Sequence, residues 1–100
     1  MVVYNVTVKV DWDVHEDWLS WMKETHIPDV INTGLFSGYK VFKLMSLDET
    51  DGITYAIQYF CDSMEQYLTY EREYASQLQQ AHLARYKDKF VAFRTLMKSI

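Results

Sequence analysis

The sequence contains few of the residues that interrupt regular structure or cross-link a chain. Of its 100 residues, three are glycine, one is proline and one is cysteine. This composition excludes a disordered or low-complexity chain, and a chain of this length buries roughly 65% of its extended surface, enough for one core. Cys61 alone can form neither an intramolecular disulfide nor a multi-cysteine zinc site. We therefore predict one domain over residues 1–100, in the reducing environment of the cytoplasm.

Basic residues and long apolar runs are also scarce. Ten Lys and Arg residues stand against 14 Asp and Glu residues, which gives a net charge of −4. This balance repels phosphate backbones. No run of 18 apolar residues is present, and the first residues lack the charged and apolar segments of a signal peptide. We therefore expect neither nucleic acid nor a membrane as a partner.

Aromatic residues, by contrast, are abundant. The chain has eight Tyr, five Phe and three Trp. Because so small a domain has too little interior for all of them, we expect some at an interface or around a pocket. They are densest around residues 18–30, which combine two tryptophans with Met22, His26 and the only proline.

The first predicted helix begins after Asp13, which is a suitable N-cap with Glu16 three residues later. Pro28 lacks an N–H group and disfavours α geometry at the residue before it, so the regular helix should end near His26. One more short turn over residues 28–32 can follow, since proline fits the first helical position. The buried face of this helix is predicted from helical spacing at five positions: Val14, Trp18, Trp21, Met22 and Thr25.

The second predicted helix opens with a capping box formed by Ser63 and Gln66 and runs weakly on to Tyr86. At 1.5 Å per residue it would be roughly 36 Å long, more than a four-stranded sheet needs, so we expect a bend near residues 80–83. Alternating apolar residues predict four strands, over residues 2–10, 37–46, 52–61 and 90–97. Asp51-Gly52 suits a hairpin tip with a positive φ, so the second and third strands should pair antiparallel.

The order βαββαβ predicts an α+β ferredoxin-like sandwich, with a four-stranded antiparallel sheet and two helices on one face. Both faces of the predicted strands are substantially apolar, so the face without helices would form an exposed apolar patch. We therefore predict a homodimer through the open sheet face, of the dimeric α/β-barrel type. The RNA-recognition motif shares this element order, but the acidic surplus and Asp51 before the third strand disfavour RNA binding.

Several segments resemble an uncharacterised bacterial family, domain of unknown function 4286, which is similar to the dimeric α/β-barrel group. The resemblance covers nearly the whole chain but implies no activity, because the wider group includes cofactor-poor monooxygenases, haem-degrading enzymes, isomerases and domains without known catalysis. The residues that carry it are Trp21-Met22, His26-Ile27-Pro28-Asp29-Val30 with Thr33-Gly34 and Phe36, Thr54-Tyr55-Ala56-Ile57-Gln58-Tyr59, and Phe90-Val91-Ala92-Phe93-Arg94-Thr95-Leu96-Met97.

His26 is the candidate catalytic residue. At a helix end before proline, among aromatic residues, it would lie at the mouth of a barrel pocket and could act as a general acid or base. Alternatively, it caps the last carbonyls of its helix and interacts favourably with the helix dipole.

Five polar residues interrupt otherwise apolar strands: Asn5, Thr7, Gln58, Arg94 and Thr95. Of these, Asn5, Gln58 and Arg94 are the candidate ligand-binding residues, because they could orient a carboxylate or carbonyl group with Arg94 as the anion clamp. Alternatively, Arg94 pairs with an acidic residue across the dimer interface or faces water.

We predict neither a metal site nor another cofactor. His15, His26 and His82 are too widely separated for a recognisable metal-binding motif. Analogy with the haem-degrading members of the barrel group would make His82 an axial ligand and Asn5 a distal group, but the second helix lacks the tryptophan that those members usually carry.

Two functions remain. The first is a non-catalytic, small-molecule-binding or structural homodimer. The alternative is a cofactor-independent monooxygenase or isomerase that acts on a small aromatic or dicarbonyl compound, with His26 as base and Arg94 or Gln58 orienting the substrate.

Overall fold

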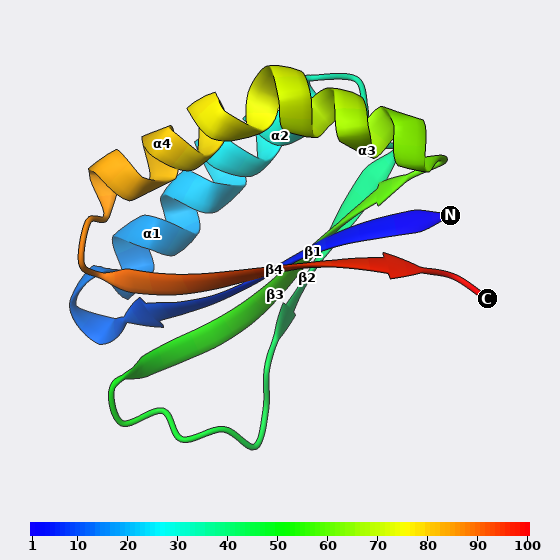
Figure 1. Ribbon diagram of the computed structural model, residues 1–100. Coiled ribbons are helices and arrows are strands. Elements are labelled where there is room, and N and C mark those ends of the chain that lie inside the picture. Colours follow the sequence, from blue (N-terminus) through cyan, green and yellow to red (C-terminus); the bar gives the residue numbers. More distant parts are fainter.

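The four strands form one antiparallel sheet, and the helices cover one of its faces (Figure 1). A computed structural model describes residues 1–100. The strands lie in the order β2-β3-β1-β4, which is the ferredoxin-like arrangement predicted from the order of elements. Their bounds are β1 Val2–Asp11, β2 Gly38–Lys43, β3 Gly52–Cys61 and β4 Phe90–Lys98.

The predicted bounds of β1, β3 and β4 are confirmed to within one residue, because these strands have strongly alternating or continuous β-forming residues. β2 is shorter than predicted. It is an edge strand that pairs with β3 only, and the chain leaves the sheet after Lys43. In the following loop Ser46 adopts a positive φ of 66°, and the loop is tied back where Trp12 Nε1 donates a hydrogen bond to the Glu49 carbonyl at 2.6 Å.

Gly52 does not supply the positive φ that was expected at the hairpin tip. Instead it pairs with Asp11 in the β1–β3 ladder, and a Cβ atom at this position would collide with the carbonyl oxygen of Val10. Glycine is therefore required for the close approach of two backbones rather than for a turn.

The first helical segment passes through Pro28 instead of ending at His26. It consists of α1 His15–Trp21, a π turn Met22–His26 and α2 Ile27–Ile31. The Ile27 N–H donates to the Met22 carbonyl, five residues back. This wider turn shifts the hydrogen-bond pattern by one residue just before the proline that cannot donate, so the helix continues. The prediction of an end at His26 is wrong, whereas the further turn expected after it is present.

The start of this segment also differs from the prediction. Residues Trp12–Val14 form a 3-10 turn before α1, and Asp13 does not cap the helix. Its carboxylate instead accepts a hydrogen bond from Lys89 Nζ at 2.7 Å. Of the predicted buried face, Trp18 and Met22 are fully buried, but Thr25 is exposed.

The second helical segment consists of α3 Met64–Tyr70, a π turn Glu71–Ala75 and α4 Ser76–Arg85. The predicted Ser63 cap is confirmed, because its Oγ accepts from the Gln66 N–H at 3.3 Å. Gln66 Oε1 reaches back to the Asp62 N–H at 2.9 Å. The bend expected at residues 80–83 is wrong, since α4 runs through them and the departure from α geometry is the earlier π turn.

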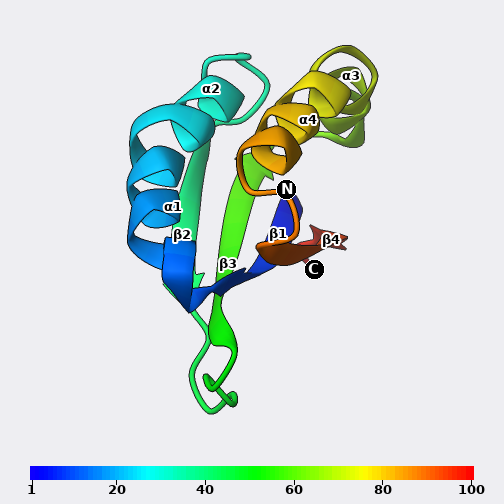
Figure 2. The same ribbon diagram turned by 90° about the vertical axis from the view of Figure 1, so that its left-hand side faces the viewer.

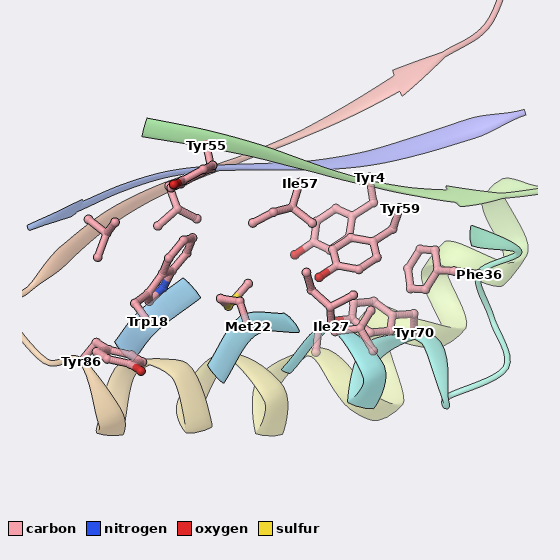
Figure 3. Close-up of a cluster of buried hydrophobic side chains, with 14 of the residues drawn as sticks. Tyr4, Trp18, Met22, Ile27, Phe36, Tyr55, Ile57, Tyr59, Tyr70 and Tyr86 are labelled. Atoms are coloured by element: carbon pink, nitrogen blue, oxygen red, sulfur yellow. The ribbon is translucent and has the colours of Figure 1, made fainter. Parts of the chain in front are cut away.

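The core fills the space between the sheet and the two helical segments, which lie beside each other above it (Figure 2). Side chains at alternate positions of β1 and β3 point from the sheet toward Trp18, Met22 and Ile27 of the first segment (Figure 3). At one end of the core Tyr4 packs among four aromatic rings, with centroid distances of 5.3 to 6.2 Å. The buried apolar side chains of β1 and β3 are Tyr4, Val8, Val10, Ile53, Tyr55, Ile57, Tyr59 and Cys61.

The opposite face, here called the open sheet face, is not covered by any helix (Figure 1). Large apolar side chains are exposed on it: Phe42 is 46%, Val91 57% and Phe93 67% exposed. No helix of the chain is long and apolar enough to cross a bilayer. The open sheet face carries Val3, Asn5, Thr7 and Lys9 of β1, Lys40 and Phe42 of β2, Thr54, Ala56, Gln58 and Phe60 of β3, and Val91, Phe93, Thr95 and Met97 of β4.

Candidate functional site

The covered side of the sheet contains a small cavity, here called the inner cavity, with a volume of about 20 Å³. This volume accommodates one water molecule or one ligand atom of similar size. Residues from β1, β3, β4 and both helical segments line it. Its polar side chains include Tyr4, His26, Gln79, His82 and Arg94.

His26 reaches the inner cavity from the last position of the first π turn. Its ring stacks on Trp21, with a centroid distance of 4.9 Å and an interplanar angle of 26°. Its Nδ1 atom is buried and has no hydrogen-bond partner. Burial lowers the pKa of His26 to about 4; nearby Asp29 raises it and Arg94 lowers it further. The imidazole is therefore neutral near pH 7.

This placement corrects the expected position of His26. The residue lies within a continuous helical segment rather than at a helix end, and its unpartnered Nδ1 does not cap a carbonyl. The π turn before Pro28 is the cause, because it carries the helix past the proline. His26 therefore faces the interior.

His82, on α4, is the residue of this site whose importance is not apparent from the sequence. It is 3% exposed, and its Nε2 accepts a hydrogen bond from Trp18 Nε1 at 2.9 Å. That bond places the ring proton on Nδ1. Burial lowers the pKa of His82 to about 3, with His26 and Arg94 acting in the same direction. Its four-residue spacing from Leu78 and Tyr86 predicts a buried position, but the partner 64 residues earlier is not apparent.

Arg94 projects from β4 toward the helices, since it pairs in register with Val6 and lines the inner cavity. The side chain is also exposed, so it forms a boundary between the cavity and solvent. The four ion pairs of the structure all involve other residues. Burial raises the pKa of the Tyr4 hydroxyl, although Arg94 and Gln79 act in the opposite direction. Arg94 is thus a cation without a carboxylate partner.

A second hollow, here called the outer groove, lies between α4 and β4 and has a volume of about 220 Å³. Gln79 and Arg94 line both the outer groove and the inner cavity. Gln79 was not a candidate from the sequence, because a glutamine on an amphipathic helix is usually a solvated residue. The remaining residues of the outer groove are Gln80, Leu83, Phe90 and Ala92.

Asn5 and Gln58 do not join this site. They face each other across the β1–β3 ladder on the open sheet face, and Asn5 Nδ2 donates to Thr7 Oγ1 at 3.0 Å. The structure therefore brings His26 and Arg94 together and places Asn5 and Gln58 on the other side of the sheet. An Arg94 pair across the open sheet face does not fit this arrangement either, because Arg94 points away from that face.

The haem alternative does not fit the site. The inner cavity is far smaller than a porphyrin, His82 Nε2 is already bonded to Trp18, and Asn5 lies on the opposite face of the sheet. Nowhere do three His, Cys, Asp or Glu side chains converge in a way that could hold a metal ion.

Comparison with known sequences identifies the family of this chain. The sequence model of the family described as "Domain of unknown function (DUF4286)" matches residues 1–100. The chain belongs to this family. A search of curated protein sequences finds no significant match to this DUF4286 chain.

Solved structures with the same fold as this DUF4286 protein are numerous. An ethyl tert-butyl ether D (EthD) family protein from Bacillus halodurans matches with a TM-score of 0.69 and 10% identity over 100% of both chains. HapK from Hahella chejuensis gives a TM-score of 0.71 and 7% identity over 100% of this chain and 93% of HapK. SnoaB, a cofactor-independent oxygenase from Streptomyces nogalater, gives a TM-score of 0.61 and 11% identity over 98% of this chain and 92% of SnoaB. These likenesses establish a fold of the dimeric α/β-barrel type.

Proposed function

We propose that this DUF4286 protein is a non-catalytic, small-molecule-binding homodimer of the cytoplasm. The observation that carries the proposal is the unpaired Arg94 beside a cavity in which His26 Nδ1 lacks a protein partner. Buried polar groups are nearly always hydrogen-bonded. A ligand that enters the inner cavity, or the water molecule that it displaces, would supply the missing hydrogen-bond partner of His26 Nδ1.

The open sheet face supports the dimer. Phe42, Val91 and Phe93 expose large apolar surfaces on one side of the sheet, and no part of the same chain covers them. Phe42 and Phe93 lie on opposite edges of the sheet, in one row with Ala56 and Thr7. Exposed apolar surface on an uncovered face is typical of interaction sites. Two copies related by a twofold axis would bury the patch on both partners with the same residues.

The size of the inner cavity and the basicity of His26 favour binding over catalysis. A cavity of about 20 Å³ holds a single small group, whereas enzyme pockets enclose most of their substrate. Efficient general bases have a pKa near the working pH, and burial lowers the pKa of His26 to about 4. The imidazole is available as a hydrogen-bond partner but is a weak base.

The alternative is a cofactor-independent monooxygenase or isomerase that acts on a small aromatic or dicarbonyl compound. It is supported by the neutral His26 with an unpartnered nitrogen next to Arg94, which could accept a substrate proton while Arg94 orients a carbonyl oxygen. The fold is shared with SnoaB, which is a cofactor-independent oxygenase. Gln58 has no part in this alternative, because it lies on the open sheet face.

Native mass spectrometry of freshly purified protein tests the proposal. We expect a species of twice the 11.9 kDa chain mass, with a retained small molecule released on denaturation. A monomer at micromolar concentration would refute the dimer. If the released molecule is re-added and is converted to a product by the wild-type protein but not by His26→Phe, the enzymatic alternative replaces the binding function.

A further inference from the structure

The inner cavity and the outer groove adjoin at two side chains, and their linings differ in character. Gln79 and Arg94 belong to both hollows. The inner cavity brings together hydroxyl, amide and imidazole groups in a volume of about 20 Å³. The outer groove is about ten times larger and is lined on one side by Leu83, Phe90 and Ala92. A ligand that occupied both would have a small polar end and an apolar body.

The charge of this pair of hollows is positive and comes from Arg94. Neither hollow has an Asp or Glu residue in its lining, and Arg94 makes no ion pair elsewhere. His26 and His82 are neutral near pH 7 because burial lowers the pKa of both. The chain as a whole is acidic, with a net charge of −4, yet the Arg94 guanidinium at the cavity mouth has no acidic partner. It would therefore attract a ligand that carries a single negative charge.

The geometry around Arg94 suits a carboxylate in particular. A guanidinium presents parallel N–H donors that match the two oxygens of a carboxylate. The Tyr4 hydroxyl and the Gln79 amide lie in the same lining and offer further donors to an oxygen. The inner cavity holds one such oxygen but not a phosphate group with its additional oxygens.

The apolar wall of the outer groove is held rigidly. The Phe90 ring packs flat on the buried His82 ring, with a centroid distance of 3.9 Å and an interplanar angle of 8°. His82 is in turn fixed by its hydrogen bond from Trp18. A rigid aromatic wall favours a flat ligand, since little side-chain entropy is lost when the ligand stacks against it.

We propose that this DUF4286 protein binds a small monocarboxylic acid with a flat apolar body, whose carboxylate lies on Arg94 with one oxygen in the inner cavity. The body lies in the outer groove against Phe90, Ala92 and Leu83. This inference rests on the proposed small-molecule-binding function and names the chemical class of its ligand.

Titration calorimetry with trans-cinnamate tests the charge requirement, with cinnamamide as the neutral compound of nearly the same shape. We expect cinnamate to bind at least about tenfold more tightly than cinnamamide. Arg94→Gln should weaken cinnamate binding by at least about tenfold and abolish the difference between the two compounds. Arg72→Gln removes the same charge from an exposed arginine paired with Glu73 and should leave binding unchanged. Equal binding of the two compounds, or full binding by Arg94→Gln, would overturn the inference.

A second pair of variants tests the position of the ligand without changing Arg94. Leu83 and Leu68 are similarly exposed, at 46% and 47%, but only Leu83 lines the outer groove. Leu83→Glu should weaken cinnamate binding several-fold through like-charge repulsion, whereas Leu68→Glu should not. Backbone amide NMR shifts on adding cinnamate should centre on β4 and α4. Shifts centred on the open sheet face would place the ligand elsewhere and refute the site.

Failure of this inference can be distinguished from failure of the proposed function. A neutral molecule retained in native mass spectrometry, together with equal binding of cinnamate and cinnamamide, would refute the acid class and preserve small-molecule binding. The absence of any retained molecule, together with no binding of cinnamate, cinnamamide, hexanoate or benzoate by the ligand-free dimer, would refute both.

Discussion

The two faces of the sheet differ in how far their side chains are buried. On the covered face, most alternate residues of β1 and β3 are buried, and Ile57 is 1% exposed, although Val2 and Val6 are half-buried. On the open sheet face, the residues between them are half-buried or exposed, and Phe93 is 67% exposed. The covered face buries its apolar side chains within one chain, whereas the open sheet face leaves Phe42, Val91 and Phe93 exposed.

The difference between the faces nearly disappears at β4. Phe90 and Ala92 are half-buried beneath α4, but from Phe93 to Lys98 the strand is exposed on both sides. The covered face of β4 therefore carries a solvent-accessible cation without an ion pair, Arg94, whereas the exposed Lys43 of β2 is paired with Glu49. The residue proposed to bind an anion therefore lies where the helical cover of the sheet ends, not at its centre.

The largest expected effect is on the open sheet face. Phe93→Asp should weaken the proposed dimer by at least about 100-fold, because two unpaired carboxylates would be buried at the twofold interface. Sedimentation velocity measures the change, and Leu68→Asp on α3 is the control for an exposed apolar residue on the helical side. Unchanged sedimentation of Phe93→Asp would show that the open face is not the interface.

Two neighbouring residues of β3 should separate the faces by stability. Ile57→Ala should lower the free energy of unfolding by about 3 kcal/mol, because it leaves a cavity in the covered core. Gln58→Ala should lower it by less than about 0.5 kcal/mol when measured in the Phe93→Asp background, where the interface is already disrupted. Urea unfolding followed by circular dichroism gives both values. Similar losses would contradict the assignment of the two faces.

Acid should destabilise the covered face first. Burial lowers the pKa of His26 to about 4 and of His82 to about 3, so both residues bind protons more readily in the unfolded chain. The contribution of each residue is fully favourable above the unfolded value of about 6.5 and is lost progressively as the pH falls to 4, by roughly 3 kcal/mol per residue. His26→Phe, which keeps a ring against Trp21, should flatten this dependence. An unfolding free energy that is constant between pH 7 and 4 would contradict it.

The smallest expected effect is on the stability of Arg94→Gln, in contrast to its effect on ligand affinity. The cinnamate affinity of Arg94→Gln should fall while its unfolding free energy changes by less than about 1 kcal/mol, because Arg94 is exposed and makes no ion pair. Calorimetry and urea unfolding on the same preparation separate the two effects. A large loss of stability would make Arg94 part of the core structure rather than of a binding site.

The sequence predicts the architecture well because its strands alternate clearly and the second helical segment opens with a recognisable cap. Gly52–Cys61 has the predicted bounds, and the Ser63 cap is present. The pairing register between β1 and β4 could not be predicted in the same way. The face on which Arg94 lies follows from its pairing with Val6, and that pairing depends on the meeting of strands more than 80 residues apart. The sequence could not therefore separate Arg94 from Asn5 and Gln58.

The helical details are predictable only in part, for a related reason. Pro28 predicts a helix end by its own chemistry, but the chain passes it through a π turn whose Met22 and His26 line the inner cavity together with residues of the sheet. His82 is similar, because its role depends on Trp18 and Phe90 from distant parts of the chain. Local patterns identify such residues as buried but cannot identify their partners.

The stacking of Trp21 on His26 gives the protein a built-in optical indicator. An excited indole transfers an electron readily to a protonated imidazole and much less readily to a neutral one, so protonation of His26 should quench Trp21 fluorescence. Trp12 is exposed, Trp18 is buried and Trp21 is half-buried, so Trp12 should emit at longer wavelength than the other two. Unmodified protein can therefore report the ionisation of His26 without labels.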